Sequence, residues 1–168
     1  MTNISTKIIF FGNERLVSGL KHTDAPVLKG LIEQGYNVCA VVSHHSEGQS
    51  RSNRDLEVAT IADKHNIPVH LPKRPSEIID DLRNYQADAA ILVSYGRIIP
   101  QSVIDIFPKG IINIHPSLLP LYRGPTPIES VITNGDVTTG VSVMQLTAGM
   151  DEGPVFIQQE IELDGTET

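Results

Sequence analysis

The sequence predicts an α/β fold built on a mostly parallel sheet with helices on both faces. Short β-rich segments alternate with longer segments whose apolar residues have helical spacing, and the connections between them are short. The segments 37–43 and 87–96 are apolar almost throughout, as is typical of strands covered on both faces. Because such sheets bind ligands at the carboxyl ends of their strands, we look for function there.

The same reasoning assigns each element in order. Gly35 ends the first helix, and Pro127 stands in the first turn of the last one. Only 147–153 separates the final two strands, which is too short for a crossover helix, so we expect that pair to be antiparallel. We predict strands at 7–12, 37–43, 67–71, 87–96, 110–115, 139–146 and 153–163, and helices at 25–35, 55–66, 75–86, 100–107 and 124–135.

Composition places the chain among soluble globular proteins. Its 168 residues suffice for one domain with a hydrophobic core. The net charge of −7 argues against an extended nucleic-acid-binding surface. Cys39 is the single cysteine and cannot form an internal disulfide, and no apolar segment is long enough to span a membrane. We therefore expect a cytoplasmic protein without a membrane anchor, and a monomer.

Two common kinds of site are not predicted. The first strand is followed by glycines at positions 12 and 19 only, which is not the spacing of a dinucleotide-binding or phosphate-binding loop. His44 and His45 are adjacent, so they point apart on an extended chain, and no nearby cysteine or third histidine completes a metal site. We interpret both as solvated loop residues and expect no metal.

A polar pair interrupts the apolar segment 110–115. Asn113 and His115 are two residues apart, so on a strand their side chains share a face. An imidazole can act as a general acid or base near neutral pH, and an amide can donate a hydrogen bond to a developing oxyanion. Asp151 and Glu152, in the loop 147–153 at the same edge of the predicted sheet, are candidates for a carboxylate that orients the histidine.

Segments around this pair resemble a known family. The stretch 113–154 contains, in order, Asn-x-His, Ser-Leu-Leu-Pro, Arg-Gly and Asp-x-Gly, and it is similar to the signature region of the 10-formyltetrahydrofolate-dependent formyltransferases. The stretch 94–100, SYGRIIP, resembles the segment that lines the folate pocket in that family. The likeness is good from about residue 88 onward and looser before it. It implies a Rossmann-like formyltransferase fold over 1–168 and 10-formyltetrahydrofolate as formyl donor.

The resemblance also implies roles for individual residues. Asn113, His115 and Asp151 would form the catalytic trio, with the amide and the protonated imidazole stabilising an oxyanion. The donor would be held by the residues after the strand that carries this trio, by the 94–100 segment and by the backbone near the carboxylate. These predicted folate contacts are Ser117, Leu118, Leu119, Pro120, Tyr95, Gly96, Arg97, Ile98 and Gly149.

The acceptor amine is less sharply indicated. The stretch 141–156 looks most like the members that formylate methionyl-tRNA, which implies a role in translation initiation. Those members usually carry Gly-Thr-Pro-x-Phe-Ala after the first strand, where this chain has GNERLVS. Arg51 and Arg54 in the polar loop 43–55 could contact tRNA phosphates, and a solvated loop is the alternative.

Other readings stay open. Nucleotide-sugar N-formyltransferases share the Ser-Leu-Leu-Pro and Arg-Gly segments, so an amino-sugar nucleotide is the alternative acceptor. The chain also stops at 164–168 in what resembles a turn, so we expect a catalytic domain truncated at its C-terminus, without the tRNA-binding β-barrel of the family's tRNA enzymes. Such a fragment could be a folate-binding lobe that is inactive as truncated.

Overall fold

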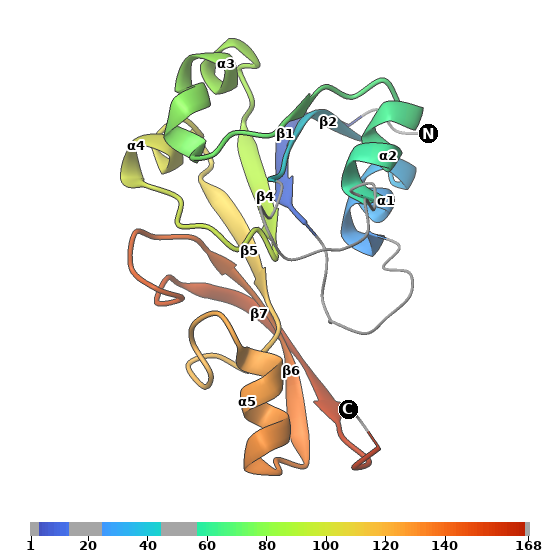
Figure 1. Cartoon of the computed structure of the whole chain (residues 1–168), viewed down its shortest axis with the longest axis vertical. Coiled ribbons are helices and arrows are strands. Elements are labelled where there is room, and N and C mark those ends of the chain that lie inside the picture. The colour runs from blue at the N-terminus through green and yellow to red at the C-terminus, as the bar shows by residue number, and fades with distance from the viewer. Residues whose placement is uncertain (1–3, 14–24, 45–56, 167–168) are drawn as a thin grey trace. The chain divides into compact units, whose positions relative to one another are not determined.

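The computed structural model describes residues 4–13, 25–44 and 57–166, and the chain divides into two compact units, Met1–Ile111 and Ile112–Thr168 (Figure 1). Arg51, Arg54 and His45 therefore lie outside the described residues. Within the described ranges, no helix combines the length and the apolar character that crossing a bilayer requires.

The first unit is a parallel sheet with helices on two sides. Its strands are β1 (Ile4–Gly12), β2 (Tyr36–Val42), β3 (Val69–His70) and β4 (Ala89–Val93). Strand β1 pairs in parallel with β2 and β4, and β2 pairs in parallel with β3. Helices α1 and α2 lie on one side of these strands, and α3 and α4 lie on the other (Figure 1). The helices are α1 (Pro26–Glu33), α2 (Glu57–Lys64), the 3₁₀ helix η1 (Pro75–Ile78), α3 (Ile79–Asn84) and α4 (Gln101–Ile104).

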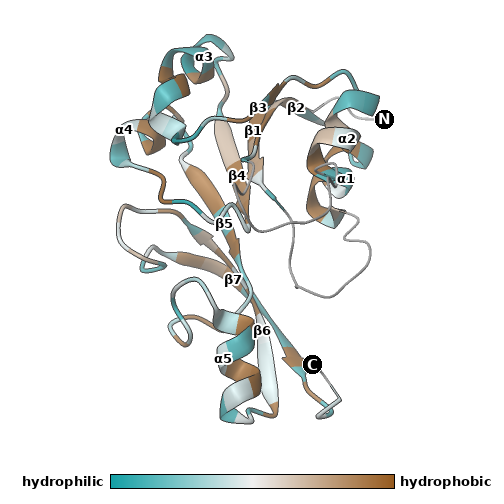
Figure 2. Ribbon diagram, viewed as in Figure 1, coloured by the Kyte–Doolittle hydropathy of each residue, from teal (hydrophilic) through white to brown (hydrophobic). Residues whose placement is uncertain are grey.

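Apolar strands form the core of this unit. Ile9, Phe10 and Phe11 in β1 are fully buried, and Figure 2 shows the hydrophobic colouring concentrated along β1 and β4. The ring of Phe11 meets that of Tyr95 edge to face, with 5.5 Å between the ring centroids. Each fully buried large apolar side chain contributes about 1.5–3 kcal/mol relative to exposure, so this layer holds the carboxyl ends of the strands in place.

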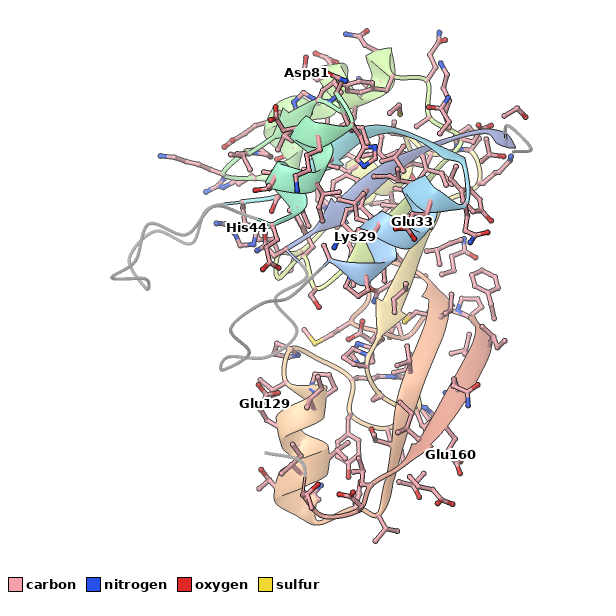
Figure 3. The ribbon with its side chains drawn as sticks, turned by 90° about the vertical axis from the view of Figure 1, so that its right-hand side faces the viewer. Lys29, Glu33, His44, Asp81, Glu129 and Glu160 are labelled. Atoms are coloured by element: carbon pink, nitrogen blue, oxygen red, sulfur yellow. The ribbon has the colours of Figure 1, made fainter. Side chains whose placement is uncertain are left out.

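The second unit is antiparallel. It contains most of β5 (Ile111–His115), then α5 (Pro127–Asn134), β6 (Thr138–Gln145) and β7 (Val155–Glu162). Strand β6 pairs antiparallel with both β5 and β7, which confirms the expected antiparallel final pair. In Figure 3, Glu129 marks α5 and Glu160 marks β7, and both side chains are exposed. The α/β class with parallel strands first and antiparallel strands last is thus confirmed.

Several predicted elements are shorter in the structure, among them the helix expected at 100–107, which covers Gln101–Ile104, and the strand expected at 87–96, which covers Ala89–Val93. Two further differences have a clear local reason. The strand expected at 67–71 is reduced to Val69–His70, since prolines at 68 and 72 remove backbone donors on either side. The helix expected at 75–86 begins as 3₁₀, because the Glu77 N–H bonds to the Arg74 carbonyl at 3.0 Å before the α-helix begins at Ile79. Neither change moves the strand ends that matter below.

Candidate active site

Strand β5 ends with two buried polar side chains. Asn113 is 6% exposed and His115 is 5% exposed, and the burial alternates along the strand as the sequence predicts. Their register partners on β6 are Met144 and Ser142. Because buried polar groups are costly unless they are hydrogen-bonded, both side chains need partners close by.

Asp151 supplies those partners. It lies in the loop between β6 and β7, and its Oδ1 accepts a hydrogen bond from Asn113 Nδ2 at 3.3 Å. Its Oδ2 lies 3.7 Å from His115 Nδ1, and both side chains are largely buried. The structure therefore brings the three predicted catalytic residues together, although Asn113 and Asp151 are 38 positions apart in the sequence.

The two ring nitrogens of His115 face different acceptors. Nε2 lies 2.9 Å from the Tyr122 carbonyl oxygen, and Nδ1 faces the Asp151 carboxylate. Because the carbonyl oxygen lies within hydrogen-bonding distance of Nε2, whereas 3.7 Å is too long for a hydrogen bond from Nδ1, we assign the proton of the neutral ring to Nε2. A protonated ring would direct one N–H toward each acceptor, so this arrangement suits an imidazolium as well.

The turn 122–124 positions both groups that face the His115 ring, the Tyr122 carbonyl and the Asp151 carboxylate. Gly124 donates its backbone N–H to Asp151 Oδ2 at 2.9 Å, and Tyr122, two residues earlier, provides the carbonyl that holds His115. Gly124 has φ +106°, which L side chains rarely adopt. The Arg-Gly element of the sequence therefore has a physical role here, since its glycine orients the carboxylate.

The second carboxylate considered from the sequence, that of Glu152, does not join this cluster. Its side chain is exposed and lies against Gly149, where an added Cβ would sit 1.8 Å from Glu152 Oε1. Glycine at 149 thus makes room for Glu152, while Asp151 turns inward. Among the described residues, no group of three His, Cys, Asp or Glu side chains is placed to hold a metal ion.

This set of side chains suits acyl transfer to an amine. The amide and a protonated imidazole are hydrogen-bond donors for an oxyanion, and the carboxylate can accept a proton or stabilise the imidazolium. The trio contains no hydroxyl or thiol nucleophile, so the attacking group would come from a substrate.

Comparison with known proteins shows which family the chain belongs to. The family model described as formyl transferase matches residues 7–168. The chain belongs to the formyl transferase family.

Curated relatives agree with this assignment. The chain is 40% identical to the methionyl-tRNA formyltransferase of Chloroflexus aggregans over 142 residues, which are 81% of this chain and 45% of that protein. It is 36% identical to the methionyl-tRNA formyltransferase of Thermotoga sp. strain RQ2, over 96% of this chain and 51% of that protein. The chain thus spans about half the length of these relatives.

Solved structures show the same fold. The phosphoribosylglycinamide formyltransferase of Bacillus halodurans superposes with a TM-score of 0.77 at 24% identity, covering 97% of this chain and 82% of that one. The formyltetrahydrofolate deformylase of Pseudomonas syringae gives 0.75 at 21% identity, over 97% of this chain and 53% of that one. At these identities the likeness extends to the fold alone.

The formyl transferase segment Ser-Leu-Leu-Pro forms a tightly bonded loop after β5. Ser117 is fully buried, and its hydroxyl donates to the Leu121 carbonyl at 2.6 Å. Leu119 is also buried, whereas Pro120 is exposed and Leu118 is partly so, packing where a Cβ on Gly140 would clash with it. Of the four predicted folate contacts in this loop, at 117–120, Leu118 and Pro120 have side chains exposed enough to touch a ligand.

Ser142 and Gln158 fasten this loop to the sheet. The Ser142 hydroxyl donates to the Ser117 carbonyl at 2.6 Å and accepts the Leu119 N–H at 3.0 Å. Gln158 Nε2 on β7 donates to the Leu119 carbonyl at 2.8 Å and to Ser142 Oγ at 2.9 Å. These bonds, of which the two to Ser117 and the Leu119 N–H are buried, fix the loop together with the prolines.

The predicted folate contacts at 95–98 lie in the first unit, just beyond β4, whereas Gly149 lies in the loop between β6 and β7 of the second unit. Tyr95 is fully buried, and burial raises its pKa to about 12, so its hydroxyl stays protonated. Within the part of the chain that the structure describes, its hydroxyl has no hydrogen-bond partner. Gly96 and Arg97 are exposed, and Ile98 is 82% exposed. The apolar side chain of Ile98 is therefore largely free to contact a ligand.

The structure corrects the interpretation of His44 as a solvated loop residue. Its side chain follows β2 and is buried, and its ring Nε2 lies 2.7 Å from the Tyr95 carbonyl oxygen and 3.1 Å from Asn13 Nδ2 (Figure 3). The ring also meets that of Tyr95 edge to face. His44 therefore contacts the backbone of the 94–100 segment at the Tyr95 carbonyl, although the two residues are 51 positions apart in the sequence.

Sequence reasoning missed Tyr122 and Gly124 as site residues. Both orient the trio through backbone groups, which carry no residue-type signal of their own. The one available hint was the glycine at 124, directly after Arg123 in a segment otherwise rich in apolar residues and proline.

Proposed function

We propose that this chain transfers a formyl group from 10-formyltetrahydrofolate to the amino group of methionyl-tRNA, in the cytoplasm. The observation that carries the proposal is the Asp151 carboxylate, which lies within 3.3 Å of Asn113 Nδ2 and 3.7 Å of His115 Nδ1 in a formyl transferase chain. Identity of 36–40% to methionyl-tRNA formyltransferases supports the choice of acceptor.

The first step would form the new bond to the amine. The amine lone pair attacks the formyl carbon, and the carbonyl π electrons move onto oxygen as an oxyanion. Asn113 Nδ2 carries two N–H groups, of which one donates to Asp151, so the second can donate to that oxygen. A preorganised donor of this kind stabilises an oxyanion by about 3–4 kcal/mol.

The second step would break the bond to the folate. The amine gives up a proton to Asp151, directly or through one water molecule. The oxyanion then re-forms the carbonyl as the bond from carbon to the folate nitrogen breaks, and that nitrogen keeps the electron pair and takes a proton from the His115 imidazolium. Transfer of the proton from Asp151 back to His115, through one water molecule or after the two groups approach from 3.7 Å to hydrogen-bonding distance, restores the starting state.

Acceptor choice is tested with purified protein expressed from the complete gene. Radiolabelled 10-formyltetrahydrofolate is supplied with methionyl-tRNA or with an amino-sugar nucleotide, and label is counted in each acceptor. We expect labelling of methionyl-tRNA that depends on protein and donor. Labelling of the sugar nucleotide alone would contradict the acceptor, and binding of a folate analogue without transfer to either amine would contradict the enzymatic proposal.

A further inference from the structure

The carbonyl that holds His115 belongs to a residue in an unfavourable backbone conformation. Tyr122 has φ +55°, the left-handed region that non-glycine residues rarely occupy, and its carbonyl oxygen lies 2.9 Å from His115 Nε2. A residue in this region stays there only when its surroundings hold it. The question is what holds Tyr122.

The phenol of Tyr122 is tethered at the end of α5. Its hydroxyl donates a short hydrogen bond to Asp136 Oδ2, and it accepts one from Asn134 Nδ2 at 3.0 Å. That end of the helix is itself fixed, because the Asp136 N–H bonds to the Val131 carbonyl at 3.2 Å. The side chain of Tyr122 is thus bonded to one element while its carbonyl is bonded to the histidine on another.

We infer that Tyr122 is a positioning residue whose hydroxyl, through Asp136 and Asn134, fixes the protonation site of the His115 ring. With the carbonyl held in place, the neutral ring keeps its proton on Nε2 and presents Nδ1 to Asp151. Without the tether, the backbone of Tyr122 can rotate out of the left-handed region and move its carbonyl away from His115. The neutral ring then no longer favours the tautomer with its proton on Nε2. The effect on turnover rests on the proposed function, whereas the effect on the ring does not.

The two substitutions that test this remove one hydrogen bond at a time. Tyr122→Phe keeps the ring and loses the hydroxyl, and Asp136→Ala removes the acceptor from the other side. Tyr85→Phe is the matched control. Tyr85 is half-buried like Tyr122, and its hydroxyl also has a side-chain partner, His70 Nε2 at 2.8 Å. A general loss of stability from a missing phenol hydroxyl would appear in the control as well.

The direct measurement is ¹⁵N NMR of the His115 ring at a pH where the ring is neutral, with the signal assigned by its loss in His115→Gln. We expect the proton on Nε2 in the unsubstituted protein and in Tyr85→Phe, and a mixture of tautomers in Tyr122→Phe and Asp136→Ala. Turnover of Tyr122→Phe should fall about tenfold, the effect of one lost hydrogen bond, with the KM for the formyl donor little changed.

Several outcomes decide between the readings. A Tyr122→Phe protein that keeps the Nε2 tautomer, or a control that loses as much turnover, would overturn the inference. A tautomer shift in Tyr122→Phe, together with an unsubstituted protein that transfers no formyl group, would support the tether and overturn the proposed function. The two failures are therefore distinguishable.

Discussion

The backbone N–H of Gly124 lies 2.9 Å from Asp151 Oδ2, so a glycine in the turn before α5 holds the carboxylate that faces His115. The two residues are 27 positions apart in the chain. Because the donor is a backbone group, only the conformation at 124 decides whether the bond forms, and that conformation has φ +106°.

Gly124→Ala should show whether Gly124 affects turnover by holding the Asp151 carboxylate or only through the stability of the fold. A side chain at positive φ costs about 1–2 kcal/mol, so the substitution should lower the free energy of unfolding and turn the N–H away from Asp151. Turnover should fall by about tenfold or more, as for a lost hydrogen bond to a charged group. Gly35→Ala is the control, because Gly35 also has a positive φ, +81°, and it lies after α1 in the first unit, outside the turn and outside the tether of Tyr122. Equal loss of turnover in both variants, measured with equal unfolding midpoints, would remove Gly124 from the site.

The neighbouring carboxylates Asp151 and Glu152 should respond in opposite ways. Asp151→Asn keeps the size of the side chain but removes its charge, and we expect turnover to fall by about a hundredfold or more, as for loss of a general acid–base group. Glu152→Gln should leave turnover near that of the unsubstituted protein, because Glu152 is exposed and lies against Gly149. Steady-state formyl-transfer assays on both proteins test this, and a reversed order would mean that the loop presents the other carboxylate.

Asp88 should make the first unit sensitive to acid. The Lys7 backbone N–H, 2.8 Å from Asp88 Oδ2, and the nearby charge of Lys109 lower the pKa of Asp88. Because this pKa is lower in the folded than in the unfolded protein, ionised Asp88 stabilises the fold above about pH 4, and this stabilisation is lost as the pH falls through the lowered pKa.

Asp88→Asn should therefore make the free energy of unfolding depend less on pH in the acid range. Urea unfolding between about pH 2 and pH 6 measures this, with Asp81→Asn on the exposed surface of α3 as the control. If the Asp88→Asn protein loses stability with acid as steeply as the unsubstituted protein, the bond to Lys7 does not set the acid response.

Much of the fold could be predicted because its pattern is local. The apolar residues of β4 and the alternation in β5 specify strands without knowledge of their partners. The positions of Asn113 and His115 on one face follow from strand geometry alone. The short loop at 147–153 predicts an antiparallel pair and brings Asp151 to the strand end.

The remainder depends on contacts that the pattern does not contain. His44 looks like a loop residue because its partner is the Tyr95 carbonyl in the segment after β4, 51 positions away in the sequence. Tyr122 and Gly124 act through a carbonyl and an N–H, groups that every such residue has. Ser117 is typical of a ligand contact by its motif, yet its hydroxyl is bonded to the Leu121 carbonyl within the loop. Long-range and backbone-mediated contacts are thus what the sequence left open.

The central claim is that the imidazole of His115, held between the Tyr122 carbonyl and Asp151, takes part in formyl transfer. The most direct measurement compares single-turnover formyl transfer to methionyl-tRNA by the unsubstituted protein and by His115→Gln, with unfolding midpoints recorded for both. We predict that the rate of transfer falls by about a hundredfold or more while the midpoint changes little. A folded His115→Gln protein that transfers the formyl group at nearly the original rate would contradict the account.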